Sequence, residues 1–230
     1  MENDKTLFRI KTLTELHGAP GFEEEVRDYM KQEMTPFVDE VITTHMGSIF
    51  GVKKSKKQNA KRVMIAAHMD EIGFMITNIT QNGMLQFTNL GGVSNDIWQG
   101  QRLQVKNRKG EKIVGVVSNI PKHFRTGNEA VPEIKDLMLD IGAESDKEVR
   151  SRGIEIGDTI VPFTPFTQLS EHRYSAKAWD NRYGCVLAIE ILELLKDVEL
   201  DVDLYVGANV QEEVGLRGAK ASTELIRSEE

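Results

Sequence analysis

The stretch Val63-Met64-Ile65-Ala66-Ala67-His68-Met69-Asp70 decides the fold. Its five leading apolar residues predict a buried strand of a parallel or mixed sheet. His68 and Asp70 follow that strand directly, where open α/β sheets bind their ligands. This spacing lets the carboxylate of Asp70 accept a hydrogen bond from the imidazole of His68, as beside a metal-ligating histidine. A surface histidine placed after a strand would give the same pattern.

The sequence on either side of this stretch shows two different patterns of predicted elements. Up to residue 70 and again from residue 165, predicted helices alternate with predicted strands, as in an α/β domain. Between residues 71 and 164, short β-like runs are separated by turn signals such as Asn82-Gly83 and Lys109-Gly110. We therefore expect an α/β domain formed by residues 1–70 and 165–230, interrupted by a small inserted β-barrel or sandwich, residues 71–164.

The elements of the α/β domain can be placed by periodicity and stop signals. The predicted helices cover residues 7–16, 22–30, 183–196 and 216–228. The predicted strands, besides 63–67, cover residues 38–43, 48–52, 173–178 and 202–210. The inserted region has one predicted helix, residues 144–152. The basic run Lys53-Lys54-Ser55-Lys56-Lys57 lies between two apolar stretches and is interpreted as a solvated hairpin tip.

Composition excludes several classes of protein. The chain has 230 residues, 40% of them hydrophobic and 28% charged, which is typical of one large or two modest globular domains. Its net charge is −7, whereas nucleic-acid-binding domains are usually basic. The single cysteine, Cys185, cannot form an internal disulfide and suits a reducing compartment. The sequence shows no signal peptide and no long apolar run, so we expect a cytoplasmic protein without a membrane span.

Two further clusters could carry chemistry. Asp180-Asn181-Arg182 lies just before a predicted helix, where the aspartate could cap the helix or could bridge two cations. Glu212-Glu213 follows a predicted strand, and two adjacent carboxylates there are costly to bury without a cation, although a solvated loop would tolerate them. In a functional site, one glutamate would bind a metal and the other would act as general base toward water.

The three clusters are more informative together than singly. All three follow predicted strands of the same α/β unit, so we expect them to meet at one edge of its sheet. Their donors are carboxylate oxygen and imidazole nitrogen, without a thiolate, which suits Zn²⁺, Co²⁺ or Mn²⁺ in a hydrolytic site. An aspartate bridging two ions about 3.5–4 Å apart is the two-metal arrangement of aminopeptidases.

The motifs resemble those of the M42 family of metallo-aminopeptidases. This family includes glutamyl, deblocking and tetrahedral (TET) aminopeptidases, and some of its members have been labelled endoglucanases or cellulases. The segments that carry the resemblance are residues 66–74, 178–184 and 210–219, with support from residues 17–21, 90–92 and 100–102. The resemblance runs in order along nearly the whole chain.

The resemblance implies a fold, a site and an activity. The fold is a Zn-peptidase-like mixed sheet with flanking helices, interrupted by the inserted β-barrel. In the implied site, His68 binds one of two divalent ions, zinc or cobalt, while Asp180 bridges both and Glu213 binds the second. Glu212 is the general base and Asp70 holds His68. The implied reaction is removal of N-terminal residues from peptide substrates.

The resemblance also implies an assembly, and the comparison shows where this chain departs from the family pattern. Residues 71–164 correspond to a dimerisation domain that builds dimers into a dodecamer. The family supplies two further ligands, an aspartate and a histidine, at positions beyond Glu230. The remaining histidines are poor substitutes for them; these are His17, His45, His123 and His172. We therefore expect a C-terminally incomplete catalytic domain that alone binds metal weakly and hydrolyses little.

Two alternatives remain open. The chain could be a truncated, non-catalytic relative that only oligomerises through its β insertion. A glycoside hydrolase would need two carboxylates about 5–5.5 or 6.5–9.5 Å apart, on either side of a sugar bond. The adjacent Glu212 and Glu213 fit that requirement poorly, and it leaves no role for His68.

Overall fold

The computed structural model describes residues 2–118 and 132–227. The chain divides into two compact units, each considered by itself below. The first unit is formed by Met1–Glu71 and Pro165–Glu230, and the second by Ile72–Thr164. His123, weighed above as a possible ligand, lies outside the described residues.

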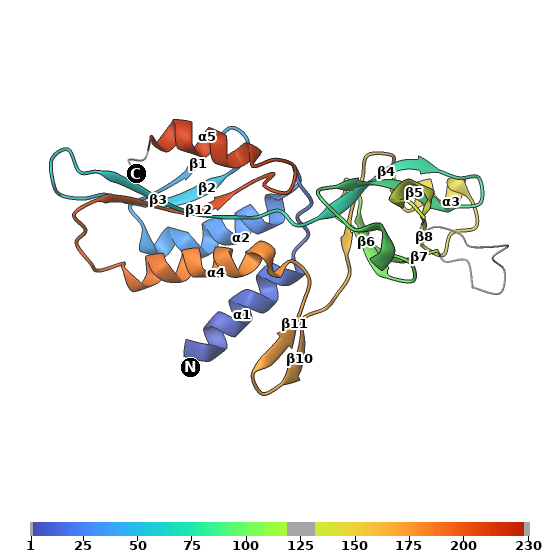
Figure 1. Ribbon diagram of the computed structural model, residues 1–230, viewed down its shortest axis with the longest axis horizontal. Helices are drawn as coiled ribbons and strands as arrows, with labels where there is room; N and C mark the ends of the chain where they lie inside the picture. The colour runs from blue at the N-terminus through green and yellow to red at the C-terminus, as the bar shows by residue number, and fades with distance from the viewer. Residues whose placement is uncertain (1, 119–131, 228–230) are drawn as a thin grey trace. The chain divides into compact units, whose positions relative to one another are not determined.

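The first unit is organised around a four-stranded mixed sheet (Figure 1). Its strands, in spatial order, are β1 (Glu40–Thr43), β2 (Ile49–Lys53), β12 (Asp203–Asn209) and β3 (Arg62–His68). β2 pairs antiparallel with both β1 and β12, whereas β12 and β3 run parallel. The parallel register sets Asn209 opposite His68, so both strands end at the same level.

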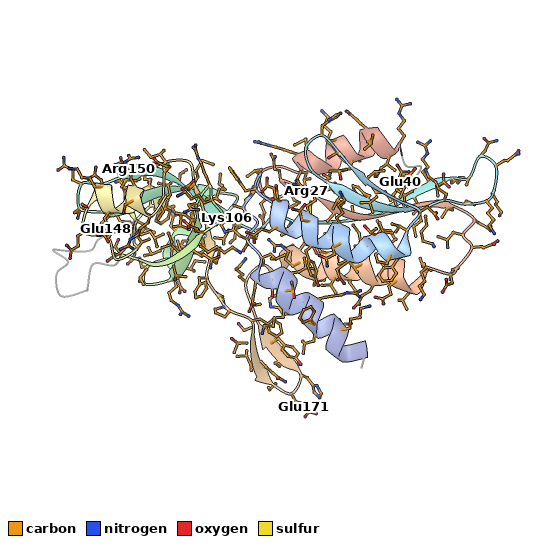
Figure 2. The ribbon with its side chains drawn as sticks, turned by 180° about the vertical axis from the view of Figure 1, so that it is seen from behind. Arg27, Glu40, Lys106, Glu148, Arg150 and Glu171 are labelled. Atoms are coloured by element: carbon orange, nitrogen blue, oxygen red, sulfur yellow. The ribbon has the colours of Figure 1, made fainter. Side chains whose placement is uncertain are left out.

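Helices cover both faces of this sheet. They are α1 (Glu2–Glu15), α2 (Glu24–Met34), α4 (Trp179–Leu194) and α5 (Arg217–Ile226). Figure 1 shows α5 on one face and α2 with α4 on the other, while α1 packs against α4. The apolar side chains of α2 and α4, such as Met30 and Ile189, are fully buried against β12 residues such as Val206. A short hairpin, β10 (Thr167–Ser170) with β11 (Arg173–Ser175), completes the unit, and Glu171 lies at its tip (Figure 2).

The strand after Arg62 differs from expectation in its burial. The run 63–67 was predicted to form a buried strand, but β3 lies at the edge of the described sheet, and Ile65 is 42% exposed. The interior position belongs to β12, where Val206 and Ala208 are fully buried. An apolar run of this length therefore identified a strand correctly but not its place in the sheet.

The basic run before β3 is not a hairpin tip. β2 and β3 are not paired with each other, because β12 lies between them. The connection therefore crosses the end of β12, where its lysines meet the acidic segment before that strand. Lys56 pairs with Glu199, and Lys57 Nζ lies 2.7 Å from Asp201 Oδ1. Lys54, Lys56 and Lys57 are exposed, as expected, whereas Lys53 is buried at the end of β2. Lys56 and Lys57 neutralise acidic neighbours rather than face only solvent.

The second unit is a closed barrel. Its strands, in spatial order, are β4 (Gly73–Ile79), β5 (Leu85–Leu90), β8 (Met138–Asp140), β7 (Lys112–Val117), β6 (Arg102–Lys106) and β9 (Thr159–Pro162). The ring of Phe74 packs edge-to-face on both Phe87 and Trp98, with centroid distances of 5.0 and 4.8 Å, at the centre of an apolar core. The short helix α3 (Asp146–Ser151) carries Glu148 and Arg150 on its surface (Figure 2).

The predicted fold class is confirmed. The chain is an α/β protein whose mixed sheet with flanking helices is interrupted by a closed β-barrel. The helices predicted at 7–16, 22–30, 183–196 and 216–228 correspond to α1, α2, α4 and α5, with ends displaced by a few residues. Among the described residues, no helix is both long enough and apolar enough to cross a membrane.

Candidate active site

The parallel pair of strands β3 and β12 brings two of the predicted residues together. His68 ends β3, and Glu212 follows three residues after β12 ends at Asn209. The amide of Met69 donates to the carbonyl of Asn209 at 2.8 Å, which ties the two strand ends to each other. As a result, His68 Nε2 and Glu212 Oε2 are 3.8 Å apart.

Asp180 reaches the same place by a different route. It was expected to follow a strand of the same α/β unit, and β11 does lie in the first unit. In the described structure, however, β11 pairs only with β10 and is not part of the four-stranded sheet. Asp180 instead lies in the first turn of α4 with non-helical backbone angles, and the capping position belongs to Ala178. Its Oδ1 is 3.1 Å from His68 Nε2, and 85% of its side chain is exposed. Asp180 therefore faces His68 rather than capping the helix.

Asp70 is fully buried and contacts both sides of this cluster. Its carboxylate accepts hydrogen bonds from the backbone amides of Glu212 and Glu213, both at 3.0 Å. His68 Nδ1 lies 3.1 Å from the carbonyl oxygen of Asp70 and 3.5 Å from its carboxylate, so the carbonyl is the closer acceptor. The sequence analysis expected the carboxylate of Asp70 to accept from the imidazole, but the backbone carbonyl is nearer. The carboxylate instead accepts from the loop that carries the two glutamates.

Burial and neighbouring charges shift the pKa values of His68 and Glu213. Burial by itself lowers the pKa of His68, but hydrogen bonding to Asp70 and the nearby carboxylates of Glu212 and Asp180 raise it overall. Burial raises the pKa of Glu213, and the negative charges of Asp70, Glu212 and Asp180 add to that rise. Acidic groups crowded around one imidazole in this way favour a cation among them.

Sequence reasoning missed a buried ion cluster next to this site. Arg182 is fully buried; its Nε donates to the carbonyl of Met69 at 2.8 Å, and its Nη2 lies 3.2 Å from Glu71 Oε1. Lys177 Nζ contacts the same glutamate oxygen at 2.5 Å. A Cβ at Gly18 would lie 2.5 Å from the Arg182 guanidinium, so glycine leaves room for it. The position of Arg182 beside Asp180 in the motif was the available signal.

The donors present suit a divalent ion in kind but are few in number. The imidazole of His68 and the carboxylate of Asp180 are a nitrogen and an oxygen ligand of the kind that Zn²⁺ and Co²⁺ take. Among residues 2–118 and 132–227, no group of three or more His, Cys, Asp or Glu side chains is arranged to hold a metal ion. Protein metal sites for Zn²⁺ have three or four such ligands.

Comparison with known proteins gives the family. The model of the M42 glutamyl aminopeptidase family matches residues 47–230. A glutamyl aminopeptidase of Lactococcus lactis subsp. cremoris is 44% identical over 220 residues, which cover 94% of this chain and 62% of the relative. The chain therefore belongs to the M42 aminopeptidase family, and it spans less than two thirds of the length of this relative.

Solved structures agree with this assignment. An aminopeptidase of the archaeon Desulfurococcus kamchatkensis is 37% identical, with a TM-score of 0.92 over 99% of this chain and 62% of that one. The TET1 peptidase of Pyrococcus horikoshii, which can assemble into a tetrahedron or a large octahedral shell, is 31% identical. Its TM-score is 0.87 over 97% of this chain and 66% of that one.

Proposed function

We propose that this chain carries part of the active site of a metal-dependent aminopeptidase that removes N-terminal residues from peptides. The observation that supports it most is that the carboxylates of Asp180 and Glu212 both lie near Nε2 of His68, at 3.1 and 3.8 Å. These residues come from a strand end, a helix start and a loop, so their convergence is a property of the tertiary structure. Membership of the M42 family supports the same function.

Each residue has a role in this proposal. His68, Asp180 and Glu213 would hold the divalent ions, zinc or cobalt, that the proposal requires. The ions supply Lewis-acid activation of the substrate carbonyl and of water. Glu212 is 35% exposed in its side chain and accepts the proton of the attacking water, then delivers it to the leaving amine. Asp70 keeps the imidazole and the glutamate loop in position.

The experiment replaces the proposed base while keeping its shape. Glu212→Gln retains the backbone amide that Asp70 binds, so the fold should be unchanged. Turnover of aminoacyl 4-nitroanilides with added Zn²⁺ or Co²⁺ should fall by about 10²–10⁴-fold, the usual contribution of a general base. Glu224→Gln, an exposed change on α5, is the matched control and should leave turnover unaltered. Turnover that survives Glu212→Gln or removal of metal by a chelator would contradict the proposal.

A second candidate follows from the small number of ligands. Since the described residues provide no group of three donors, a non-catalytic member of the family that only assembles remains the alternative. We propose that assembly uses the barrel unit, residues 72–164, in line with the shells formed by the TET1 relative. Calorimetric titration with Co²⁺ and light scattering decide between the two: assembly without metal binding and without turnover favours the alternative.

A further inference from the structure

Glu23 is a buried carboxylate near the site that has no role in the mechanism above. Only 3% of it is exposed, although it stands at the N-cap position of α2. A glutamate at that position does not need to be buried, and its side chain makes no capping hydrogen bond to the helix. Something other than helix capping therefore accounts for where this carboxylate points.

The partners of Glu23 lie in the site loop. Its Oε1 accepts a hydrogen bond from the amide of Gly21 at 2.7 Å and another from the amide of Gln211 at 3.0 Å. Gln211 is the residue directly before Glu212, and 188 positions separate it from Glu23. One oxygen thus ties the turn before α2 to the loop after β12.

Glu23 and Asp70 together hold three consecutive amides. Glu23 accepts from Gln211, and Asp70 accepts from Glu212 and Glu213. Gln211 has a φ of 52°, a left-handed conformation that non-glycine residues rarely adopt. Such a conformation persists only where surrounding contacts impose it. The backbone of Gln211 has two such contacts: its amide donates to Glu23, and its carbonyl accepts from the amide of Arg217 at 3.2 Å.

Burying this carboxylate has a cost that helix stability does not explain. Burial raises the pKa of Glu23 to about 7, and the nearby charge of Asp70 adds to the rise despite the two amide donors. No ion pair of Glu23 is found within the described parts of the chain. Buried ionisable groups with displaced pKa values gather at functional sites, where geometry matters more than stability.

We propose that Glu23 is a positioning residue that fixes the direction in which Glu212 and Glu213 leave β12, through its hydrogen bond to the Gln211 amide. This rests on the proposed function of the two glutamates. The bond sets where the loop turns, and Asp70 then sets the next two residues. Loss of a residue that orients metal ligands costs about 10–100-fold in metal affinity or activity.

The test separates the length of the side chain from its charge. Glu23→Asp keeps the charge but withdraws the oxygens by one methylene, so the bond to Gln211 is lost. Glu23→Gln removes the charge but keeps an oxygen at the same reach, so the bond remains. Hydrogen exchange of a peptide covering residues 209–216 should speed up at least 10-fold in Glu23→Asp and stay near the native rate in Glu23→Gln. Glu24→Asp, exposed and adjacent, is the control.

Calorimetric Co²⁺ titration gives the second readout on the full chain. We expect about 10–100-fold weaker binding in Glu23→Asp and recovery in Glu23→Gln. Unchanged exchange in Glu23→Asp overturns the positioning role, as does faster exchange with native metal affinity. If the native chain binds no Co²⁺, the proposed metal function fails instead, and the exchange rates still decide whether Glu23 holds the loop. Loss in Glu23→Gln with native behaviour in Glu23→Asp would mean that charge, not reach, is what matters, and would overturn the proposal. Equal loss in both variants would show no dependence on reach and would overturn it as well.

Discussion

The two units bury different kinds of side chain. The buried acidic and basic residues of the first unit are Arg9, His17, Glu23, Lys53, His68, Asp70, Glu71, Lys177 and Arg182. In the described part of the barrel unit, the buried ionisable residue is Asp158, and the core cluster is wholly apolar. Buried charges cost free energy unless each has its partners, whereas an apolar core is stabilised by volume and contact. The interior of the first unit therefore depends on pairing between buried charges, and the barrel core does not.

This difference can be measured because each unit holds one of the two tryptophans. Trp98 lies in the barrel and Trp179 begins α4. Trp98→Phe leaves Trp179 as the reporter of the first unit, and Trp179→Phe leaves Trp98 as the reporter of the barrel. Urea unfolding followed by fluorescence then gives a free energy of unfolding for the transition that each reporter detects.

The largest effect is expected from breaking the buried ion cluster. In Arg182→Met, Glu71 keeps Lys177 but loses its second cation, and the carbonyl of Met69 loses its donor. Removing one partner from a buried ion cluster costs about 3–5 kcal/mol. The loss should appear in the Trp179 transition.

An exposed arginine gives the matched control for that change. Arg173→Met removes a guanidinium whose hydrogen bond goes to the carbonyl of the neighbouring His172. A surface substitution of this kind should change the free energy of unfolding by about 0.5 kcal/mol or less. An Arg182→Met variant as stable as Arg173→Met would show that the cluster does not hold the first unit together.

In the barrel, the corresponding test removes volume instead of charge. Leu139 on β8 is fully buried in the apolar core, and Leu139→Ala should cost about 2–5 kcal/mol through lost contacts and the cavity left behind. The Trp98 transition should report this loss. Ile156→Ala, at a barrel isoleucine that is 47% exposed, is the control and should be nearly neutral. A loss below about 1 kcal/mol at Leu139 would mean that the barrel core collapses to fill the space.

Sequence periodicity predicted most of the elements, because helices and strands depend on local pattern. It predicted the strand at 63–67 but placed it wrongly inside the sheet, since neighbours in a sheet are set by distant segments such as β12. For the same reason it interpreted residues 53–57 as a hairpin tip although β12 separates the two strands.

The site shows the same division between local and distant information. His68, Asp70, Asp180, Glu212 and Glu213 were chosen for their chemistry next to predicted element ends. The sequence placed Asp180 at a helix start but could not show that the strand before it lies outside the four-stranded sheet. It also gave no sign of the buried partners contributed by Glu23 and Glu71, because burial of a glutamate is decided by tertiary contacts far along the chain.

The smallest effect is expected from a change of pH. It concerns Glu23, a buried carboxyl group of the first unit. The pKa of Glu23 is about 7 in the folded chain against an ordinary value of 4.5. Between these values the folded state binds more protons than the unfolded state, so the stabilising contribution is complete below about pH 4.5. It is then lost as pH rises through 7.

Glu23→Gln cannot titrate, so it isolates this contribution. The free energy of unfolding of the variant minus that of the native chain, both measured with chelator present, should rise by about 1–3 kcal/mol from pH 5 to pH 8. The reason is that only the native chain loses the contribution of Glu23 over this range. Asp70, which faces Glu23, keeps its charge over that range because hydrogen bonds from His68 and two backbone amides lower its pKa despite its burial. His68 titrates in both proteins and cancels in the difference, and the exposed Glu24→Gln should parallel the native chain. If the free energy of unfolding depended on pH in the same way in the native chain and in Glu23→Gln, Glu23 would stay ionised throughout this range. Burial of Glu23 would then not distinguish the first unit from the barrel.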